Sequence, residues 1–196
     1  KSGRGSRPVG QGVEVGGMTR VKICGITNVR DAEQAIEAGV DAIGLVFAPS
    51  PRRVDLKEAK KIADAIGPWG AVVGVFVNEK IKTILKIAAR CRLSAIQLHG
   101  DEPPSVARRL SLSYKVIKAM RVATPADVSG VGNYPAEFIL WDTKTAGLYG
   151  GSGKIFDWKM LKSVRTGKPF IISGGLNSGN VAEVVRLLNP YGVDVS

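Results

Sequence analysis

The sequence contains few of the residues that cross-link small proteins or bind metals. Its 196 residues include two cysteines and one histidine. Two cysteines cannot form a disulfide framework, and with one histidine they are too few for a dedicated zinc site. We therefore expect no bound metal. This cysteine usage fits a reducing compartment, which predicts a cytoplasmic protein.

Long apolar runs and clusters of like charge are also missing. No stretch of 18 apolar residues occurs, so the sequence predicts no membrane span. The net charge is +11, which raises nucleic acid as an alternative partner, since clustered cations bind polyanions. The charge is scattered, however, and aromatic residues make up only 6% of the chain. We expect no nucleic-acid partner, and interpret the positive charge as favouring solubility and small anionic substrates.

The beginning of the chain differs in composition from the rest. Residues 1–17 are rich in glycine, serine and arginine, and they lack the apolar segment of a secretory signal. We interpret them as a disordered extension or a cloning remnant, with Met18 as the original start. Residues 18–196 are then expected to form one domain, because about 150 residues is a typical domain size.

From Arg20 onward, short apolar runs alternate with amphipathic stretches, a pattern that predicts repeated β-α units. Eight such units favour a closed (β/α)8 TIM barrel, with an open doubly wound sheet as the alternative. No Gly-x-Gly-x-x-Gly follows the first run, which disfavours a dinucleotide-binding sheet. The expected strands are Val21–Cys24, Ala42–Phe47, Val72–Val77, Ala95–Leu98, Lys115–Ala119, Phe138–Asp142, Phe170–Ser173 and Val193–Val195.

The intervening helices have recognisable ends. Asn28 is the expected N-cap of the first helix and Gly39 its end, and Asn177 is the expected N-cap of a helix along Val181–Leu188. A complete barrel has about 250 residues, whereas this sequence ends at Ser196, directly after the eighth run. We therefore expect seven helices with eight strands, in a barrel that is shortened at its C-terminal end.

Polar residues recur in phase at the ends of four expected strands. Side chains alternate along a strand, and active sites of TIM barrels lie at the carboxyl ends of the strands. Apolar neighbours separate these polar residues, so the period of two predicts one polar pocket at the mouth of the barrel. The residues concerned are Lys22 with Cys24, Gln97 with His99, Asp142, and Asp194 with Ser196.

Two glycine-rich segments follow expected strands. The segment from Ser173 to Asn177 contains Gly174 and Gly175 before a helix, where free N–H groups can bind a phosphate. An ordinary tight turn is the alternative interpretation. Residues 150–154, Gly-Gly-Ser-Gly-Lys, lack the P-loop spacing and are interpreted as a lid or a linker.

The candidate catalytic residues each have a structural alternative. Cys24 is either a small buried side chain or a base, and as a base it needs a cation such as Lys22 to lower the pKa of its thiol. Cys91 lies on the apolar stripe of its helix and is expected in the core. Asp142 is either a structural partner of Lys144 or a general acid.

Three further polar residues can be interpreted either as structural residues or as substrate-binding residues. Arg52 and Arg53 are either solvated charges or a clamp for a substrate carboxylate. His99 is either a satisfied, partly buried residue or a contact for the substrate.

Together these segments resemble the phosphoribosylanthranilate isomerase family of tryptophan biosynthesis, in order and across nearly all of the chain after residue 17. The matching motifs are Val21–Thr27, Gly74–Asn78, Gln97–Gly100, Asp142–Lys144, Gly150–Lys154, Ser173–Asn177 and Val193–Ser196. The resemblance implies an Amadori rearrangement of N-(5-phosphoribosyl)anthranilate to 1-(2-carboxyphenylamino)-1-deoxyribulose 5-phosphate, without cofactor or metal.

The resemblance also implies residue roles. Cys24 matches the general base and Asp142 the general acid, which must therefore hold opposite protonation states, a thiolate and a carboxylic acid. Arg53 matches the arginine that binds the anthranilate carboxylate. Further substrate-binding residues are Gly174 and Gly175 for phosphate, with His99, Asp194 and Ser196 in the pocket.

The sequence departs from the family at its end, where the family continues past Ser196 with the rest of the phosphate loop and a last helix. Two alternatives to an active isomerase therefore stay open: a ligand-binding module without activity, and a different phosphosugar barrel enzyme. A small phosphosugar is the expected partner in each case. The chain is expected to be a monomer or a homodimer.

Overall fold

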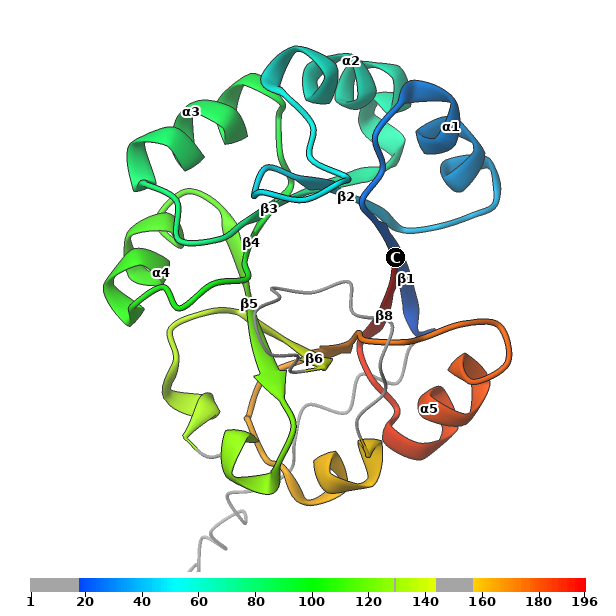
Figure 1. Cartoon of the computed structure of the whole chain (residues 1–196), viewed down its shortest axis with the longest axis vertical. Helices are drawn as coiled ribbons and strands as arrows, with labels where there is room; N and C mark the ends of the chain where they lie inside the picture. The colour runs from blue at the N-terminus through cyan, green and yellow to red at the C-terminus, as the bar shows by residue number, and fades with distance from the viewer. Residues whose placement is uncertain (1–17, 129, 144–156) are drawn as a thin grey trace, which may run out of the picture.

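The computed structural model describes residues 18–128, 130–143 and 157–196, which form a closed barrel of eight parallel strands. Seen along the barrel, the strands form an inner ring and the helices lie around its outside (Figure 1). Each strand pairs with the next, and β1 closes the ring against β8. The strands are β1 (Arg20–Cys24), β2 (Ala42–Val46), β3 (Ala71–Phe76), β4 (Ala95–Leu98), β5 (Lys115–Val122), β6 (Phe138–Thr143), β7 (Phe170–Ile172) and β8 (Gly192–Val195).

The predicted TIM barrel is therefore confirmed. Within the described residues, a helical segment follows each of the strands β1 to β7, as expected, and these segments comprise five α-helices and four 3₁₀ helices. The 3₁₀ segments replace α-helices after β5 and β6, on the lower side of the ring in Figure 1. The helices are α1 (Val29–Glu37), α2 (Leu56–Ile66), η1 (Gly67–Trp69), α3 (Ile81–Arg90), α4 (Pro104–Leu110), η2 (Pro125–Val128), η3 (Val131–Asn133), η4 (Trp158–Ser163) and α5 (Val181–Leu188).

The predicted N-cap is confirmed for α1 and wrong for α5. The side chain of Asn28 accepts a hydrogen bond from the backbone N–H of Asp31, so Asn28 caps α1 as expected. Helix α5 begins after Asn180, not after Asn177. The reason is a local turn, in which the Asn177 side chain accepts from the N–H of Gly179 and the Asn180 side chain accepts from the N–H of Asn177.

The strand register shows which side chains share the interior of the barrel. Val73, Ile117, Leu140 and Ile171 belong to one buried cluster drawn from β3, β5, β6 and β7, which places them across the interior from one another. Counting in steps of two from these positions leads to polar residues at the carboxyl ends of several strands. A second, larger cluster lies outside the ring, between the strands and helices α1 to α4.

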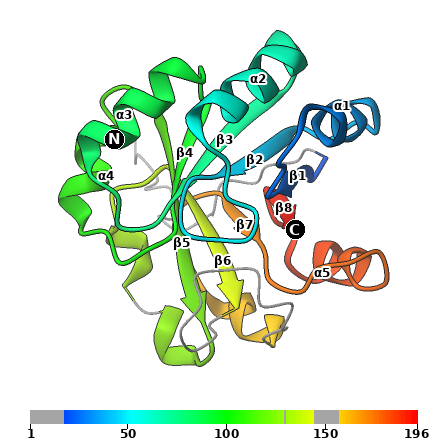
Figure 2. The ribbon, with the colours of Figure 1, turned by 45° about the horizontal axis from the view of Figure 1, so that its top comes forward.

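Within the described residues, no helix has the length and apolar character needed to cross a bilayer. A cavity of about 310 Å³ lies at the other end of the barrel, lined mostly by the first residues of the strands, such as Ala42, Ala95 and Gly192. The polar residues gather at the carboxyl ends, so this cavity is not the candidate active site. In the tilted view of Figure 2, the arrowheads of β5 and β6 mark the carboxyl ends of these strands, opposite to the end that holds the cavity.

Candidate active site

An ion pair in the candidate site links the first strand of the barrel to the last. Lys22 on β1 lies in register with Asp194 on β8, and its Nζ is 2.8 Å from Asp194 Oδ2. Both side chains are less than a tenth exposed. Burial lowers the pKa of Lys22, but the charges of Asp194 and Cys24 outweigh it and the pKa is raised overall. Lys22 therefore stays protonated inside the barrel.

Cys24 lies two residues beyond Lys22 on the same face of β1, as the sequence predicts. Burial raises the pKa of the Cys24 thiol, while the charge and hydrogen bond of Lys22 lower it and the charge of Asp194 raises it. The net direction is upward, so the expectation of a lowered pKa for the Cys24 thiol is wrong. The physical reason is that desolvation exceeds the help from Lys22, whose charge Asp194 also neutralises.

A glycine on the neighbouring strand makes room for this thiol. Gly44 on β2 is the register partner of Cys24. A Cβ at Gly44 would lie 2.7 Å from Cys24 Sγ, which is too short for a Cβ contact, and 3.1 Å from Lys22 Cε, which is tight. Glycine is therefore required here for close approach, which sequence analysis did not identify. An isolated glycine inside an apolar strand was the available signal.

Asp142 ends β6 inside the same mouth. Its Oδ2 lies 3.0 Å from Nε2 of His99, and its Oδ1 accepts a hydrogen bond of 2.8 Å from the N–H of Thr143. Nδ1 of His99 lies 3.0 Å from Nε2 of Gln97. Gln97, His99 and Asp142 are all buried. His99 therefore contacts the candidate general acid rather than standing alone in the pocket. The alternative partner of Asp142, Lys144, lies outside the described residues.

Asp194 connects the two halves of the site. Burial raises the pKa of Asp194, and the charge and hydrogen bond of Lys22 lower it. Asp194 also interacts electrostatically with His99 and Asp142, and its charge raises the pKa of Cys24. Asp194 thus lies within electrostatic reach of both Cys24 and Asp142. The predicted convergence of these side chains on one mouth of the barrel is what the structure shows.

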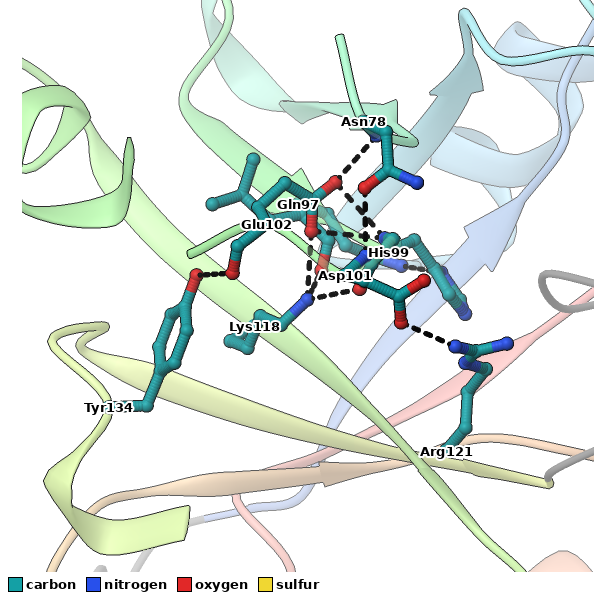
Figure 3. Close-up of polar contacts among 10 residues, drawn as sticks. Asn78, Gln97, His99, Asp101, Glu102, Lys118, Arg121 and Tyr134 are labelled. Atoms are coloured by element: carbon teal, nitrogen blue, oxygen red, sulfur yellow. Dashed lines mark hydrogen bonds and ion pairs between the residues drawn. The ribbon is translucent and has the colours of Figure 1, made fainter. Parts of the chain in front are cut away.

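Beside the mouth, a buried ion pair fixes the loop after β4 (Figure 3). Lys118 Nζ lies 2.8 Å from Glu102 Oε2, and both side chains are at most 5% exposed. Glu102 also accepts hydrogen bonds from the backbone N–H groups of Gly100 and Asn78, and Lys118 donates to the carbonyl of Gly100. The pair therefore holds the turn that directly follows His99.

Sequence analysis missed this pair, although a lysine within the apolar run of β5 signals a buried partner. It also missed Arg121, which is in register with Asp142 and hence on the same face. Arg121 Nη2 lies 2.6 Å from Asp101 Oδ1, near His99 (Figure 3).

The glycine-rich loop after β7 lies against Asp142. Gly174 and Gly175 have φ angles of +86° and +68°, a conformation that favours glycine. A Cβ at Gly174 would lie 2.3 Å from Thr143 Oγ1 and 3.0 Å from Asp142 Oδ1, so the loop packs directly on the end of β6. Among the described residues, the N–H groups of Gly174 and Gly175 have no hydrogen-bond acceptor. They are thus open to an anion.

The two arginines after β2 have different environments. Arg52 Nη1 donates to the backbone carbonyl of Cys24 over 3.0 Å, which fixes Arg52 against β1. Arg53 forms a backbone bridge with Val46 and is exposed. Arg52 is therefore already engaged, whereas Arg53, the residue that sequence analysis favoured, is accessible to a ligand.

The remaining predicted residues have simpler outcomes. Cys91 is 1% exposed and belongs to the outer core, as expected. Ser196 follows β8 and is exposed. The segments 1–17 and 150–154 lie outside the described residues. No group of three or more metal-ligating side chains lies together in the part of the chain that the structure describes.

The family model and the most similar curated proteins identify the same family. The family model for N-(5'phosphoribosyl)anthranilate (PRA) isomerase matches residues 21–196. The chain is 44% identical, over 181 residues, to the N-(5'-phosphoribosyl)anthranilate isomerase of Desulforudis audaxviator, covering 91% of this chain and 88% of that protein. It is equally similar, over the same length and coverage, to the Thermotoga maritima protein of that name.

Solved structures agree with the sequence comparison. The crystal structure of the Thermotoga maritima isomerase matches with a TM-score of 0.86 and 44% identity, covering 91% of this chain and 88% of that one. Another isomerase structure contains reduced 1-(o-carboxyphenylamino)-1-deoxyribulose 5-phosphate. It matches with a TM-score of 0.82 and 40% identity, covering 91% of this chain and 87% of that one.

Proposed function

The chain belongs to the N-(5'-phosphoribosyl)anthranilate isomerase family, and from that premise we propose which of its residues carry out the reaction. The enzyme is an isomerase of tryptophan biosynthesis that converts N-(5-phosphoribosyl)anthranilate to 1-(2-carboxyphenylamino)-1-deoxyribulose 5-phosphate. The single observation behind our assignment is the convergence of Cys24 and Asp142 on one mouth of the barrel, both within electrostatic reach of Asp194.

Asp142 is the proposed general acid. In its carboxylic acid form it donates a proton to the ring oxygen of the ribose, the bond from that oxygen to C1 breaks, and the lone pair of the substrate nitrogen makes C1 a protonated imine. Burial of Asp142 at 3% exposure keeps water from competing for this proton. Its position against Gly174 places the acid next to the loop that is open to the phosphate.

Cys24 is the proposed general base. It removes the proton from C2, and those electrons form the C1–C2 double bond of an enolamine while the electrons of the C1–N double bond return to nitrogen. A proton then adds to C1 as the C2 hydroxyl loses its own proton and becomes a ketone. Because the pKa of the thiol is raised, the thiolate is the minority form near neutral pH. Lys22 is the cation that stabilises this thiolate when it forms.

The substrate-binding residues follow from their positions. Arg53 is exposed beside the mouth and is proposed to bind the anthranilate carboxylate. Gly174 and Gly175 are proposed to bind the phosphate through their N–H groups. We further propose that His99 and Asp194 border the sugar site and that Ser196 extends the phosphate loop. The chemistry consists of proton transfers, for which these side chains suffice without a cofactor or a metal.

A small phosphosugar is thus the proposed partner. One similar structure is described as monomers generated from the dimeric isomerase of Thermotoga maritima. We propose that this chain is likewise a homodimer or a monomer, which sedimentation of the purified protein decides. We further propose that residues 18–196 are the catalytic domain and that the enzyme works in the cytoplasm without nucleic acid.

The decisive experiment measures the loss of anthranilate fluorescence on turnover. We expect Cys24→Ala and Asp142→Asn each to lower kcat by roughly 10²- to 10⁴-fold, the usual contribution of a general acid or base. Cys91→Ala is the matched control, since Cys91 lies in the outer core, and should keep its kcat. Full activity in both site variants would refute the assignment. Binding of product without any turnover in the unaltered chain would instead support a ligand-binding module.

Substrate class has its own test. Arg53→Ala should weaken kcat/KM for the anthranilate substrate by about 2–5 kcal/mol if the ion pair is buried by the ligand. An unchanged kcat/KM would remove Arg53 from the carboxylate site.

A further inference from the structure

The proposed acid is the end of a buried chain of three polar side chains. Gln97 and His99 lie two residues apart on the inward face at the end of β4, and Asp142 lies across the mouth on β6. The two contacts, Gln97 Nε2 to His99 Nδ1 and His99 Nε2 to Asp142 Oδ2, are both 3.0 Å long. Exposure along the chain is 0%, 7% and 3%, so water cannot replace either contact.

Hydrogen-bond chemistry restricts how this chain is protonated. In the orientation that the Gln97 amide adopts, its nitrogen faces Nδ1 of His99 and can only donate, which pairs it with an Nδ1 that carries no proton. A neutral imidazole then carries its proton on Nε2, which points at Asp142. The Oε1 atom of Gln97 is buried without a partner among the described residues. Gln97 thus leaves one acceptor unpaired in the orientation that fixes the imidazole.

We propose that Gln97 fixes His99 as the Nε2–H tautomer, and that His99 through this N–H positions Asp142 and stabilises the carboxylate left after proton transfer. His99 is bonded to Oδ2, whereas Oδ1, the oxygen next to Gly174, accepts one hydrogen bond from the N–H of Thr143 and can still carry the transferred proton. The bond from Nε2–H becomes stronger when Asp142 gains negative charge. Such an interaction favours the transition state over the ground state. The inference rests on the proposed role of Asp142 as general acid.

The charged groups around His99 have partners of their own. Asp194 faces both His99 and Asp142, but its charge is engaged by Lys22 at 2.8 Å. Arg121 is in register with Asp142, and its guanidinium bonds to Asp101. The ion pair of Lys118 with Glu102 fixes the turn that follows His99, and so holds the imidazole in place. His99 is therefore a positioning residue surrounded by charges that are already paired.

The test uses the fact that His99 is the single histidine of the chain. Histidine labelled with ¹⁵N in untagged protein gives one pair of ring signals, which distinguishes Nε2–H, Nδ1–H and the imidazolium directly. We expect the Nε2–H tautomer at the pH of the activity assay. An Nδ1–H tautomer or an imidazolium in the unaltered enzyme would overturn the proposal, whatever its activity.

A substitution at Gln97 tests the cause. Gln97→Glu replaces the donor with a carboxylate acceptor, and should move the proton of His99 to Nδ1 or give the imidazolium, with a fall in kcat. Gln34→Glu makes the same chemical change on the exposed face of α1 and should alter neither the spectrum nor kcat. An Nε2–H signal that persists in folded Gln97→Glu would show that Gln97 does not set the tautomer. If that variant does not fold, the spectrum of the unaltered enzyme still decides.

Substitution of His99 separates positioning from folding. His99→Met keeps the volume but removes the N–H, and should lower kcat by about 10² with KM little changed. His99→Gln supplies an amide N–H and should recover part of that loss. Equal activity of both variants and the unaltered enzyme would overturn the proposal. Inactivity of Asp142→Asn together with normal His99→Met activity would leave the proposed function intact and remove only this inference.

Discussion

At the scale of single residues, the site depends on the position of each side chain along its strand and on the groups that surround it in the fold. The location of Cys24 and Asp142 at one mouth of the barrel could be predicted from the sequence, because period-two alternation places them on the inward face at strand ends. The direction of the Cys24 pKa could not, since desolvation depends on three-dimensional burial. The sequence shows that Lys22 lies near Cys24, but it does not show that Lys22 forms an ion pair with Asp194 of β8.

One consequence concerns Gly44. Gly44→Ala places a methyl group 2.7 Å from Cys24 Sγ, so the thiol must move. We expect a clear fall in kcat, together with a loss of about 1–3 kcal/mol in the free energy of unfolding from overpacking. Thermal unfolding and the fluorescence assay measure the two effects. Gly179→Ala, where a Cβ would meet only the Asn177 side chain at 3.2 Å, should keep its activity. Unchanged kcat in Gly44→Ala would show that the thiol position is not critical.

Thiol reactivity follows from the electrostatics of Cys24. Its pKa is raised above the ordinary value of 9.0, so alkylation by iodoacetamide should be slow at neutral pH and accelerate only above pH 9. Lys22→Met removes the cation and should slow alkylation further. Mass spectrometry of the folded protein locates the label, since Cys91 is 1% exposed and should stay unmodified. Rapid alkylation of Cys24 at neutral pH would contradict the raised pKa.

At the scale of elements, the strands are more predictable than the helices. The expected strand bounds agree with the structure to within a few residues, because an apolar run buried on both faces is a strong local signal. The helix along Val181–Leu188 was predicted correctly but its N-cap was not, since side-chain bonds of Asn177 and Asn180 form a turn before α5. The turn after β4 was not predicted, because its fixing residues Lys118 and Glu102 come from separate elements.

The ion pair beside that turn gives a stability prediction. Lys118→Met leaves the carboxylate of Glu102 buried without its cation, which should cost about 3–5 kcal/mol in urea unfolding. The double variant Lys118→Met with Glu102→Gln should be less destabilised, since no unpaired charge remains. Lys60→Met breaks an exposed pair with Asp64 and should cost at most about 1 kcal/mol. Equal costs for the buried and exposed variants would contradict this account.

At the scale of the whole molecule, buried groups link stability to alkaline pH. The pKa of Cys24, of Tyr134 and of Lys22 is raised in the folded state, that of Tyr134 from 10.0 to about 12 by burial and the charge of Glu102. A raised folded pKa contributes stability that is complete below the unfolded pKa and is lost as pH rises through the folded value.

The free energy of unfolding should therefore decline as pH rises above about 9. Urea titrations between pH 7 and 11 measure this decline. Tyr134→Phe should make it shallower above pH 10, while losing about 1 kcal/mol at neutral pH with the hydrogen bond to the Glu102 carbonyl. Stability that increases from pH 9 to 11 would show that these groups do not control the alkaline response.

The pairing of β1 with β8 also has a consequence for synthesis on the ribosome. Lys22 emerges early, yet its carboxylate partner at position 194 is translated 172 residues later. At about 5–20 residues per second, the nascent chain spends roughly ten seconds or more without the contact that completes the charge balance around Cys24. The newly made thiol thus meets its cation in the working arrangement only when the last strand docks, so activity and ring closure arrive together.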